Sequence, residues 1–340
     1  MAARFILLFV LLVGACFASP SQAAFINGRS YVAVSEWATV NGFRLQSKRG
    51  DTATYTNRSQ LRFVLEKDSR TVQINGINVA MNYPAALEKG VMYVSQLDFS
   101  KTFDPLIDLP SDKTIKTVCI DPGHGGTDTG KLIGSQSEKK YTLLLAQELA
   151  NQLKAAGFNA ILTRTKDVSL ELENRPDLAN RKNADLFISL HFNAAVSSKA
   201  EVSGVETYCI TPVGASSSNS GGKGAGYGST TANAVERKSL LLAYLVHKAL
   251  VKNLGAEDRS VRRARFAVLR DAEMPAILVE GGYMTHPAES KKIFAAAYRK
   301  EMATAIVNGI QNYQRLTART QTAPTPVTKK KATKKSTTRR

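Results

Sequence analysis

Two histidines and two glutamates stand where expected secondary-structure elements begin or end: His124, Glu138, His191 and Glu280. Two imidazoles and one carboxylate make a zinc site that leaves a fourth position open for a water molecule. Zinc would lower the pKa of that water toward neutrality, and a further carboxylate would take the proton and pass it to a leaving amine. These residue types predict a metal-dependent hydrolase in which Glu280 acts as the general base.

The spacing of the three expected zinc ligands does not form a compact metal-binding motif. Glu138 lies 14 residues after His124, and His191 lies 53 residues after Glu138. A single histidine in such a position is more often a polar residue near a turn than a metal ligand. Spacing alone therefore leaves a structural role open for each histidine.

These side chains depend on elements expected between residues 117 and 314, where strand and helix patterns alternate. The expected strands are residues 117–120, 158–163, 184–190, 205–210 and 276–279. The expected helices are residues 139–156, 174–183, 238–253 and 287–313. Such alternation indicates an α/β fold with a mostly parallel, twisted sheet flanked by helices. Ligands of such sheets bind beyond the carboxyl ends of the strands, which is where His191 and Glu280 fall.

Residues 24–110 are expected to form a small α+β module that precedes the α/β domain. Short β-type runs alternate there with turn dipeptides such as Asn27-Gly28 and Asn75-Gly76. The region weakly resembles the small module at the N-terminus of copper amine oxidases. His124 is the first histidine of the chain, so we expect a spacer or binding module without metal. Residues 111–116 are an expected linker.

The first 23 residues are typical of a signal peptide. Arg4 precedes an apolar run, and Ser21-Gln22-Ala23 resembles a cleavage site. The run is too short to span a bilayer comfortably, so we expect export to the periplasm or the cell wall. Val13-Gly14-Ala15-Cys16 resembles a lipobox, which leaves lipidation at Cys16 as a minor alternative.

Half of the net charge of +18 lies at the C-terminus, because residues 315–340 hold nine Lys or Arg and no acidic residue. Their Thr, Pro and Lys composition cannot bury a core, so we expect a disordered basic tail. In an exported protein its partners would be anionic envelope polymers or lipid headgroups, and nucleic acid is the less expected partner. A solvated tail without a dedicated partner also fits.

Residues 117–314 resemble the catalytic domain of zinc-dependent N-acetylmuramoyl-L-alanine amidases. The matching segments are residues 121–126 with Asp128 and Gly130, 137–139, 162–164, Arg175 with 179–180, 184–193, 204–206, 265–270 and 274–284. The resemblance implies one α/β domain with a six-stranded sheet and one Zn²⁺ held by His124, Glu138 and His191. It also implies that Glu280 is catalytic and that the substrate is the amide bond between N-acetylmuramic acid and L-alanine in peptidoglycan, cleaved during cell-wall remodelling.

Smaller roles are expected for residues beside the four principal ones. Asp121 would orient His124. Arg164 and Arg175 would bind substrate carboxylates or form structural salt bridges, and Asn193 would contact the glycan or the peptide.

The remaining histidines and cysteines are expected to be structural. His286 stands where the family commonly has Asn, and we expect a loop residue because a catalytic zinc keeps its fourth position open. His247 lies in an apolar helical pattern. Cys119 and Cys209 lie in apolar runs, so two buried free thiols are favoured, with a single disulfide left open.

Residues 213–231 are rich in Gly, Ser, Ala and Thr and indicate a flexible surface loop. Some members of the family carry a long inhibitory helix between the third zinc ligand and the following helix, and here that part of the chain holds this loop instead. We therefore expect that this chain lacks built-in autoinhibition.

Three other functions stay open at this point. A non-catalytic protein that binds the cell wall could keep the fold, although all four principal positions are filled here. Another zinc hydrolase, such as a peptidase or deacetylase, would use the same residues on a different bond. A nucleic-acid binder would depend on the basic tail.

Overall fold

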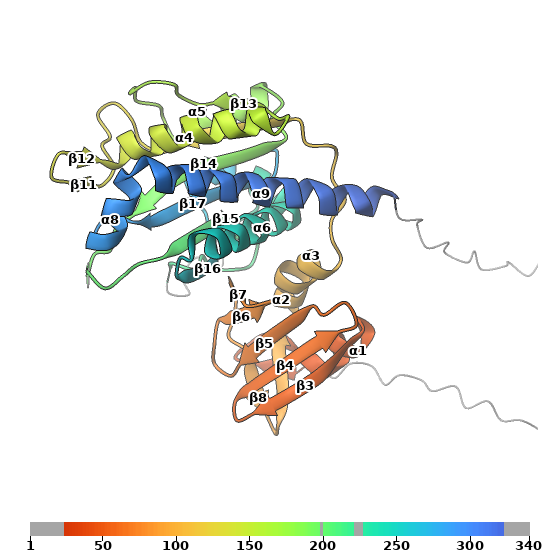
Figure 1. Ribbon diagram of the computed structural model, residues 1–340. Helices are drawn as coiled ribbons and strands as arrows, with labels where there is room; N and C mark the ends of the chain where they lie inside the picture. The colour runs from red at the N-terminus through yellow and green to blue at the C-terminus, as the bar shows by residue number, and fades with distance from the viewer. Residues whose placement is uncertain (1–23, 198–199, 221–226, 323–340) are drawn as a thin grey trace, which may run out of the picture.

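The computed structural model describes residues 24–197, 200–220 and 227–322 (Figure 1). The expected signal peptide with Cys16, and most of the expected basic tail, lie outside the described residues. An N-terminal module and a larger α/β domain follow one another along the chain. In the described ranges, no helix carries an apolar stretch of the length that a bilayer requires.

Six strands form the sheet of the α/β domain. Their order across the sheet is β13 (Asn159–Leu162), β10 (Thr117–Pro122), β14 (Leu186–Asn193), β17 (Ala276–Tyr283), β15 (Val205–Ile210) and β16 (Asp258–Ala264). The first four run parallel, β15 runs antiparallel to β17, and β16 runs parallel to β15. The expected α/β fold, with the six strands that the resemblance implies, is confirmed.

The central strands are almost continuously apolar because helices cover both faces of the sheet. In β14, Leu186, Ile188 and Leu190 are fully buried on one face, and Phe187 is fully buried on the other. The helices on the first face are α4 (Glu138–Ala155), α6 (Glu236–Leu254) and α9 (Ala296–Thr322). Those on the second are α5 (Asn174–Arg181) and α7 (Ala267–Arg270). Truncating Phe187 to Ala would cost about 3–5 kcal/mol of stability.

The single helix expected over residues 287–313 is two helices, α8 (Pro287–Phe294) and α9. The backbone leaves the helical region at Ala295, where ψ is 134°. Helix α9 then continues to Thr322, so the expectation that disorder begins at residue 315 is wrong for residues 315–322. The buried face of α9 extends past Tyr313. Thr317 is buried, and its hydroxyl donates a hydrogen bond to the Tyr313 carbonyl at 2.9 Å.

Strand β16 was not expected, because its sequence is rich in charged residues. The structure accommodates two of its arginines by pairing them. Arg262 Nη1 lies 2.6 Å from the Glu206 carboxylate, and the buried Arg263 donates to the carbonyls of Lys101 and Ile210. The strand therefore forms through partners that lie far away in the sequence.

Two sheets make up the N-terminal module. One is an antiparallel meander of β7 (Ile77–Ala80), β6 (Thr71–Ile74), β5 (Arg62–Glu66), β4 (Thr52–Asn57) and β3 (Phe43–Arg49). The other contains β1 (Ala24–Ile26), β2 (Arg29–Ala33), β9 (Val91–Ser95) and β8 (Ala86–Glu88). Its helical segments are α1 (Val34–Val40), α2 (Gln96–Asp98), η1 (Phe99–Phe103) and α3 (Asp104–Ile107). The likeness to the copper amine oxidase module stays a prediction.

The module and the α/β domain share one sheet of eleven strands, because β7 pairs in parallel with β16. Val79 stands opposite Val261 in this pair, and both are buried. The expected linker is also held in place, since the buried Asp112 carboxylate accepts a hydrogen bond from the Tyr313 hydroxyl at 2.6 Å. The module is therefore built onto the edge of the larger domain.

Shorter elements complete the connections between the long ones. They are β11 (Leu132–Ile133), β12 (Gln136–Ser137) and η2 (Thr231–Val235). The loop expected over residues 213–231 is irregular where it is described, but it is partly packed rather than freely exposed, since Ala215 and Ser216 are buried.

Candidate metal centre

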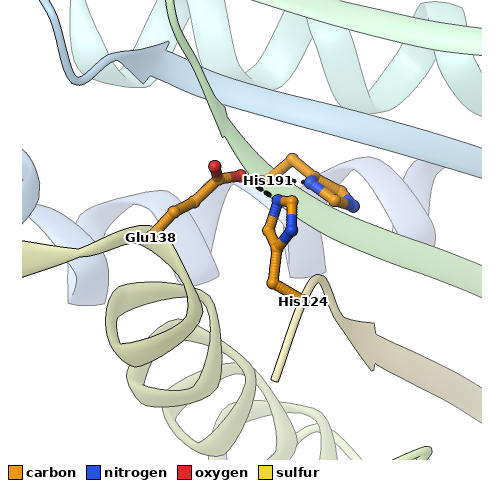
Figure 2. Close-up of side chains that lie close together, drawn as sticks. All are labelled: His124, Glu138 and His191. Atoms are coloured by element: carbon orange, nitrogen blue, oxygen red, sulfur yellow. Dashed lines mark hydrogen bonds and ion pairs between the residues drawn. The ribbon is translucent and has the colours of Figure 1, made fainter. Parts of the chain in front are cut away.

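Three side chains converge at the carboxyl ends of the central strands (Figure 2). His124 follows β10, Glu138 is the first residue of α4, and His191 lies near the end of β14. Glu138 Oε1 lies 3.0 Å from His124 Nε2 and 3.1 Å from His191 Nδ1. Within the described ranges, these residues form the one group of at least three His, Cys, Asp or Glu side chains that are close enough to hold a metal ion, with ligand atoms within 4.8 Å of one another.

This donor set fits zinc. Two imidazoles and a carboxylate are ligands that zinc prefers, and three protein ligands leave one position for water or substrate. Burial alone would raise the pKa of Glu138, but hydrogen bonds with His124 and His191 outweigh it and hold this pKa below its usual range. The carboxyl group is thus ionised, as a metal ligand must be.

Glycine is required at two positions around these ligands. A Cβ atom on Gly123 would lie 2.3 Å from His191 Cε1. Gly130 has a φ of +61°, and a Cβ there would lie 2.6 Å from Glu138 Oε2. Any side chain at either position would therefore push a ligand out of place.

Asp128, rather than Asp121, orients the first histidine. Asp128 Oδ2 lies 2.8 Å from His124 Nδ1. This partner places the ring proton on Nδ1 and leaves Nε2, which faces Glu138, free to bind a metal. The sequence offered one signal for it, namely an aspartate four residues after His124 in the same glycine-rich segment.

The expectation that Asp121 contacts His124 is wrong. Asp121 is fully buried, and its carboxylate accepts hydrogen bonds from Thr163, Ser189 and Arg175. Asp121 supports the loop that carries His124 indirectly. Its partner Arg175 also donates a hydrogen bond to the His124 carbonyl at 3.0 Å.

Arg164 and Arg175 do not present their guanidinium groups to substrate, which corrects that expectation and supports their structural alternative. Both are buried, with 3% of each residue exposed. Arg164 donates to the carbonyls of Pro122 and Gly123 at 3.0 and 2.8 Å, and Arg175 donates to that of Pro122 at 3.0 Å. Each arginine therefore holds the backbone of the loop that carries His124.

Glu280 stands beside the metal centre on β17. Its Cα is paired with that of His191 on one side and that of Glu206 on the other. Among the described residues, its buried Oε2 atom has no hydrogen-bond partner. Burial, with the nearby carboxylates of Glu138 and Glu206, raises the pKa of Glu280 well above its usual value. A carboxyl group with one oxygen atom left without a partner suits proton transfer.

Glu206 has a larger structural role than sequence reasoning assigned to it. It is 1% exposed, and its carboxylate accepts hydrogen bonds from Arg262 at 2.6 Å, Tyr208 at 2.7 Å and Tyr283 at 3.0 Å. Half-buried Asn193 donates to it at 3.1 Å. The only sequence signal was an acidic residue inside an otherwise apolar strand.

The other histidines lie outside the metal centre. The ring of buried His247 lies 3.0 Å from the Thr207 hydroxyl and 2.9 Å from Asp258 Oδ1, in agreement with a structural role. His286 precedes α8, and its Nδ1 accepts the backbone N–H of Glu289 at 3.3 Å. It caps the helix.

The two cysteines of the described chain are buried free thiols, Cys119 and Cys209. They lie on opposite faces of the sheet, each within a hydrophobic cluster. Neither belongs to the metal-binding group.

A family model described as N-acetylmuramoyl-L-alanine amidase matches residues 118–312. The N-acetylmuramoyl-L-alanine amidase AmiA of Salmonella typhimurium is 34% identical over 234 residues, which cover 59% of this chain and 78% of the relative. The amidase AmiC of Neisseria meningitidis is 34% identical over 218 residues, which cover 58% of this chain but 52% of that relative. The chain thus spans about half the length of the second relative.

One solved structure agrees with this match over the α/β domain. The N-acetylmuramoyl-L-alanine amidase of Clostridium difficile 630 superposes with a TM-score of 0.50 and 32% sequence identity. The superposition covers 60% of this chain and 98% of that structure.

Proposed function

The chain belongs to the N-acetylmuramoyl-L-alanine amidase family, and from this premise we propose that it is a zinc hydrolase of the amide bond between N-acetylmuramic acid and L-alanine in peptidoglycan. The observation that carries the proposal is the convergence of His124, Glu138 and His191 beside the unpaired carboxyl group of Glu280. Together these side chains would bring a metal ion and a proton-transfer group to one bond.

One zinc ion would be held by the imidazoles of His124 and His191 and the carboxylate of Glu138. When bound, it would polarise the lactyl carbonyl and make a water molecule nucleophilic at neutral pH. Asp128 holds the His124 ring in the tautomer that binding requires.

Glu280 moves the proton in this proposal. Its carboxylate takes a proton from the attacking water as the carbon–oxygen bond forms, and it then gives the proton to the L-alanine nitrogen as the carbon–nitrogen bond breaks. The products are a stem peptide with a free L-alanine amine and a glycan with a free lactyl carboxylate. The buried Oε2 atom of Glu280, which has no hydrogen-bond partner among the described residues, is available for both proton transfers.

The surroundings of the site support a role for Asn193 in substrate binding. Its amide group is fixed by Glu206 and its side chain is half-buried at the end of β14. We assign it a contact with the glycan or the peptide close to the cleaved bond.

The proposed site of action is the cell envelope, where peptidoglycan lies. Residues 1–23 would direct export, with lipidation at Cys16 as the minor alternative, and the basic residues beyond α9 would contact anionic envelope polymers or lipid headgroups. Fractionation of producing cells checks the compartment. A cytoplasmic protein with an intact N-terminus would contradict this part of the proposal.

Digestion of purified peptidoglycan tests the proposed reaction. Residues 24–340 are loaded with zinc, and a parallel sample is treated with EDTA. We expect release of peptides whose new amine belongs to L-alanine, and loss of this release with EDTA. A new amine on another residue would indicate a peptidase, and released acetate would indicate a deacetylase. Binding without any release would favour a non-catalytic wall-binding protein.

A further inference from the structure

A pocket of about 350 Å³ lies where the N-terminal module meets the α/β domain. Arg70 and Asn78 line it from the module, and Arg259 and Arg262 line it from β16. The two sides are fixed relative to one another, because the Asn78 backbone N–H donates to Asp258 Oδ2 at 2.8 Å and β7 pairs with β16. We refer to this space as the junction pocket.

The junction pocket is connected to the reaction centre through Glu206. Glu206 on β15 stands directly opposite Glu280 on the neighbouring strand β17. On its other side, its Oε1 atom lies 2.6 Å from Arg262 Nη1 and 3.5 Å from Arg259 Nε. The same two arginines line the junction pocket. A substrate held at Glu280 can therefore extend over them toward the module.

The arginines of the junction pocket differ in their partners. Arg259 and Arg262 are paired with Glu206. Arg70 is half-buried, and its guanidinium group has no hydrogen-bond or ion-pair partner in the part of the chain that the structure describes. A partly desolvated cation without a counterion favours an anionic ligand, and a guanidinium group suits a carboxylate in particular.

Two acidic side chains also line the junction pocket, and both have other partners. Asp258 Oδ1 lies 2.9 Å from His247 Nε2, and Oδ2 accepts the backbone N–H of Asn78. Glu257 accepts a hydrogen bond from the Ser203 hydroxyl at 2.9 Å. Neither carboxylate neutralises the unpaired arginine.

We propose that the junction pocket binds the C-terminal carboxylate of the stem peptide, with Arg70 as the principal contact. The inference rests on the proposed amidase activity, since the stem peptide is the part of that substrate which starts at the cleaved bond. In this proposal the N-terminal module contacts the substrate directly, through Arg70.

The length of a stem peptide agrees with this position. Neighbouring strands are about 4.8 Å apart, so β7, three strands away from β17 in the sheet, lies about 14 Å from the strand that carries Glu280. An extended peptide advances about 3.3–3.6 Å per residue. Four residues counted from the cleaved bond therefore reach β7, and the long side chain of Arg70, which directly precedes β6, has to cover the remaining strand spacing.

The test compares two N-acetylmuramoyl tetrapeptides that differ only at the C-terminus, one a free acid and the other an amide. For the free acid, we expect Arg70→Ala to raise KM about tenfold and leave kcat within about twofold, because one charge-assisted contact distant from the reacting atoms is lost. For the amide, the variant and the unchanged protein should have the same KM. Arg62→Ala, which removes an arginine from β5 of the same module, is the control and should alter neither substrate.

An unchanged KM for the free acid, or an equal rise for acid and amide, would overturn the inference. Calorimetric titration with the free tetrapeptide separates it from the proposed function. Tighter binding of the acid than of the amide, lost in Arg70→Ala, would support the junction pocket even if no L-alanine amine were ever released. Equal binding of acid and amide would contradict it even in an active amidase.

Discussion

At the scale of single residues, the metal-binding loop is held by side chains that do not reach the metal themselves. Arg164 and Arg175 donate hydrogen bonds to the carbonyls of Pro122, Gly123 and His124. Charge-assisted bonds of this kind are shorter and stronger than neutral ones. These bonds are made to the backbone, so they fix the position of the His124 main chain. Asp128 fixes the orientation of the His124 ring.

Asp128→Ala should weaken zinc binding by roughly 10–100-fold, because the His124 ring would lose the partner that sets its tautomer and orientation. Competition with a chromogenic chelator measures the affinity. Asp51→Ala, a change of the same type on an exposed turn of the module, should leave it unchanged. Equal zinc affinities for the Asp128 variant and the unchanged protein would remove Asp128 from the account of the site.

Glu280→Ala should lower kcat by at least about 100-fold, because proton transfer to the leaving amine would lack its donor. The variant should still bind one zinc ion per chain, since Glu280 is not in the metal-binding group. Atomic absorption and release of L-alanine amine are measured on the same sample. Full activity in this variant would show that another group moves the proton.

At the scale of elements, the direction of each strand decides which loops can reach the metal centre. His191 and Glu280 lie near the carboxyl ends of the parallel strands β14 and β17. Strand β15 runs antiparallel to β17. The segment that follows Ile210 therefore leaves the sheet at the end opposite to the carboxyl ends of β14 and β17. The Gly- and Ser-rich loop therefore starts at the end of the sheet that lies opposite the metal centre.

Replacing residues 219–228 with a short Gly-Ser linker should therefore leave kcat/KM within about twofold of the unchanged protein. The replacement retains Ala215, which is buried and whose carbonyl accepts a hydrogen bond from Arg265 at 2.8 Å. Peptide release from peptidoglycan is the measurement. A large gain in activity would mean that this loop is autoinhibitory after all.

Strand ends and apolar runs made most of the elements of the α/β domain predictable. His191 and Glu280 could be found because a titratable residue that follows directly on an apolar run stands out in the sequence. Strand β16 was not predicted, because its charged residues do not resemble a buried strand. Its arginines bind Glu206 and carbonyl groups that lie far away in the sequence. The role of Asp128 was not predicted because Asp121 offered a second carboxylate close to His124 in the sequence. Only the fold shows that the Asp121 carboxylate faces away from His124, toward Thr163 and Ser189.

At the scale of the whole molecule, the module and the α/β domain share both a sheet and a core. One continuous hydrophobic cluster includes Val34 and Phe63 of the module as well as Leu240 and Tyr313 of the larger domain. No local pattern in the sequence predicts this, because the pairing of β7 with β16 depends on residues about 180 positions apart. The module therefore belongs to the same folded core, and its loss would expose the edge of β16.

Because the core is shared, the described chain should unfold in a single calorimetric transition. Val79→Ala, at the pairing with Val261, should lower the midpoint of that one transition, with a loss of about 0.5–3 kcal/mol. Val40→Ala, at a valine of the module that is 86% exposed, should leave it unchanged. Two separate transitions, of which only the first responds to Val79→Ala, would mean that the two parts fold independently.

We propose that this protein adds water across the bond between N-acetylmuramic acid and L-alanine with the help of zinc. Mass spectrometry of peptidoglycan digested in ¹⁸O-labelled water tests it most directly. We expect label in the lactyl carboxylate of N-acetylmuramic acid and a free amine on L-alanine, both lost with EDTA and restored by zinc. Label in acetate or in a peptide carboxylate, or release that persists in EDTA, would contradict it.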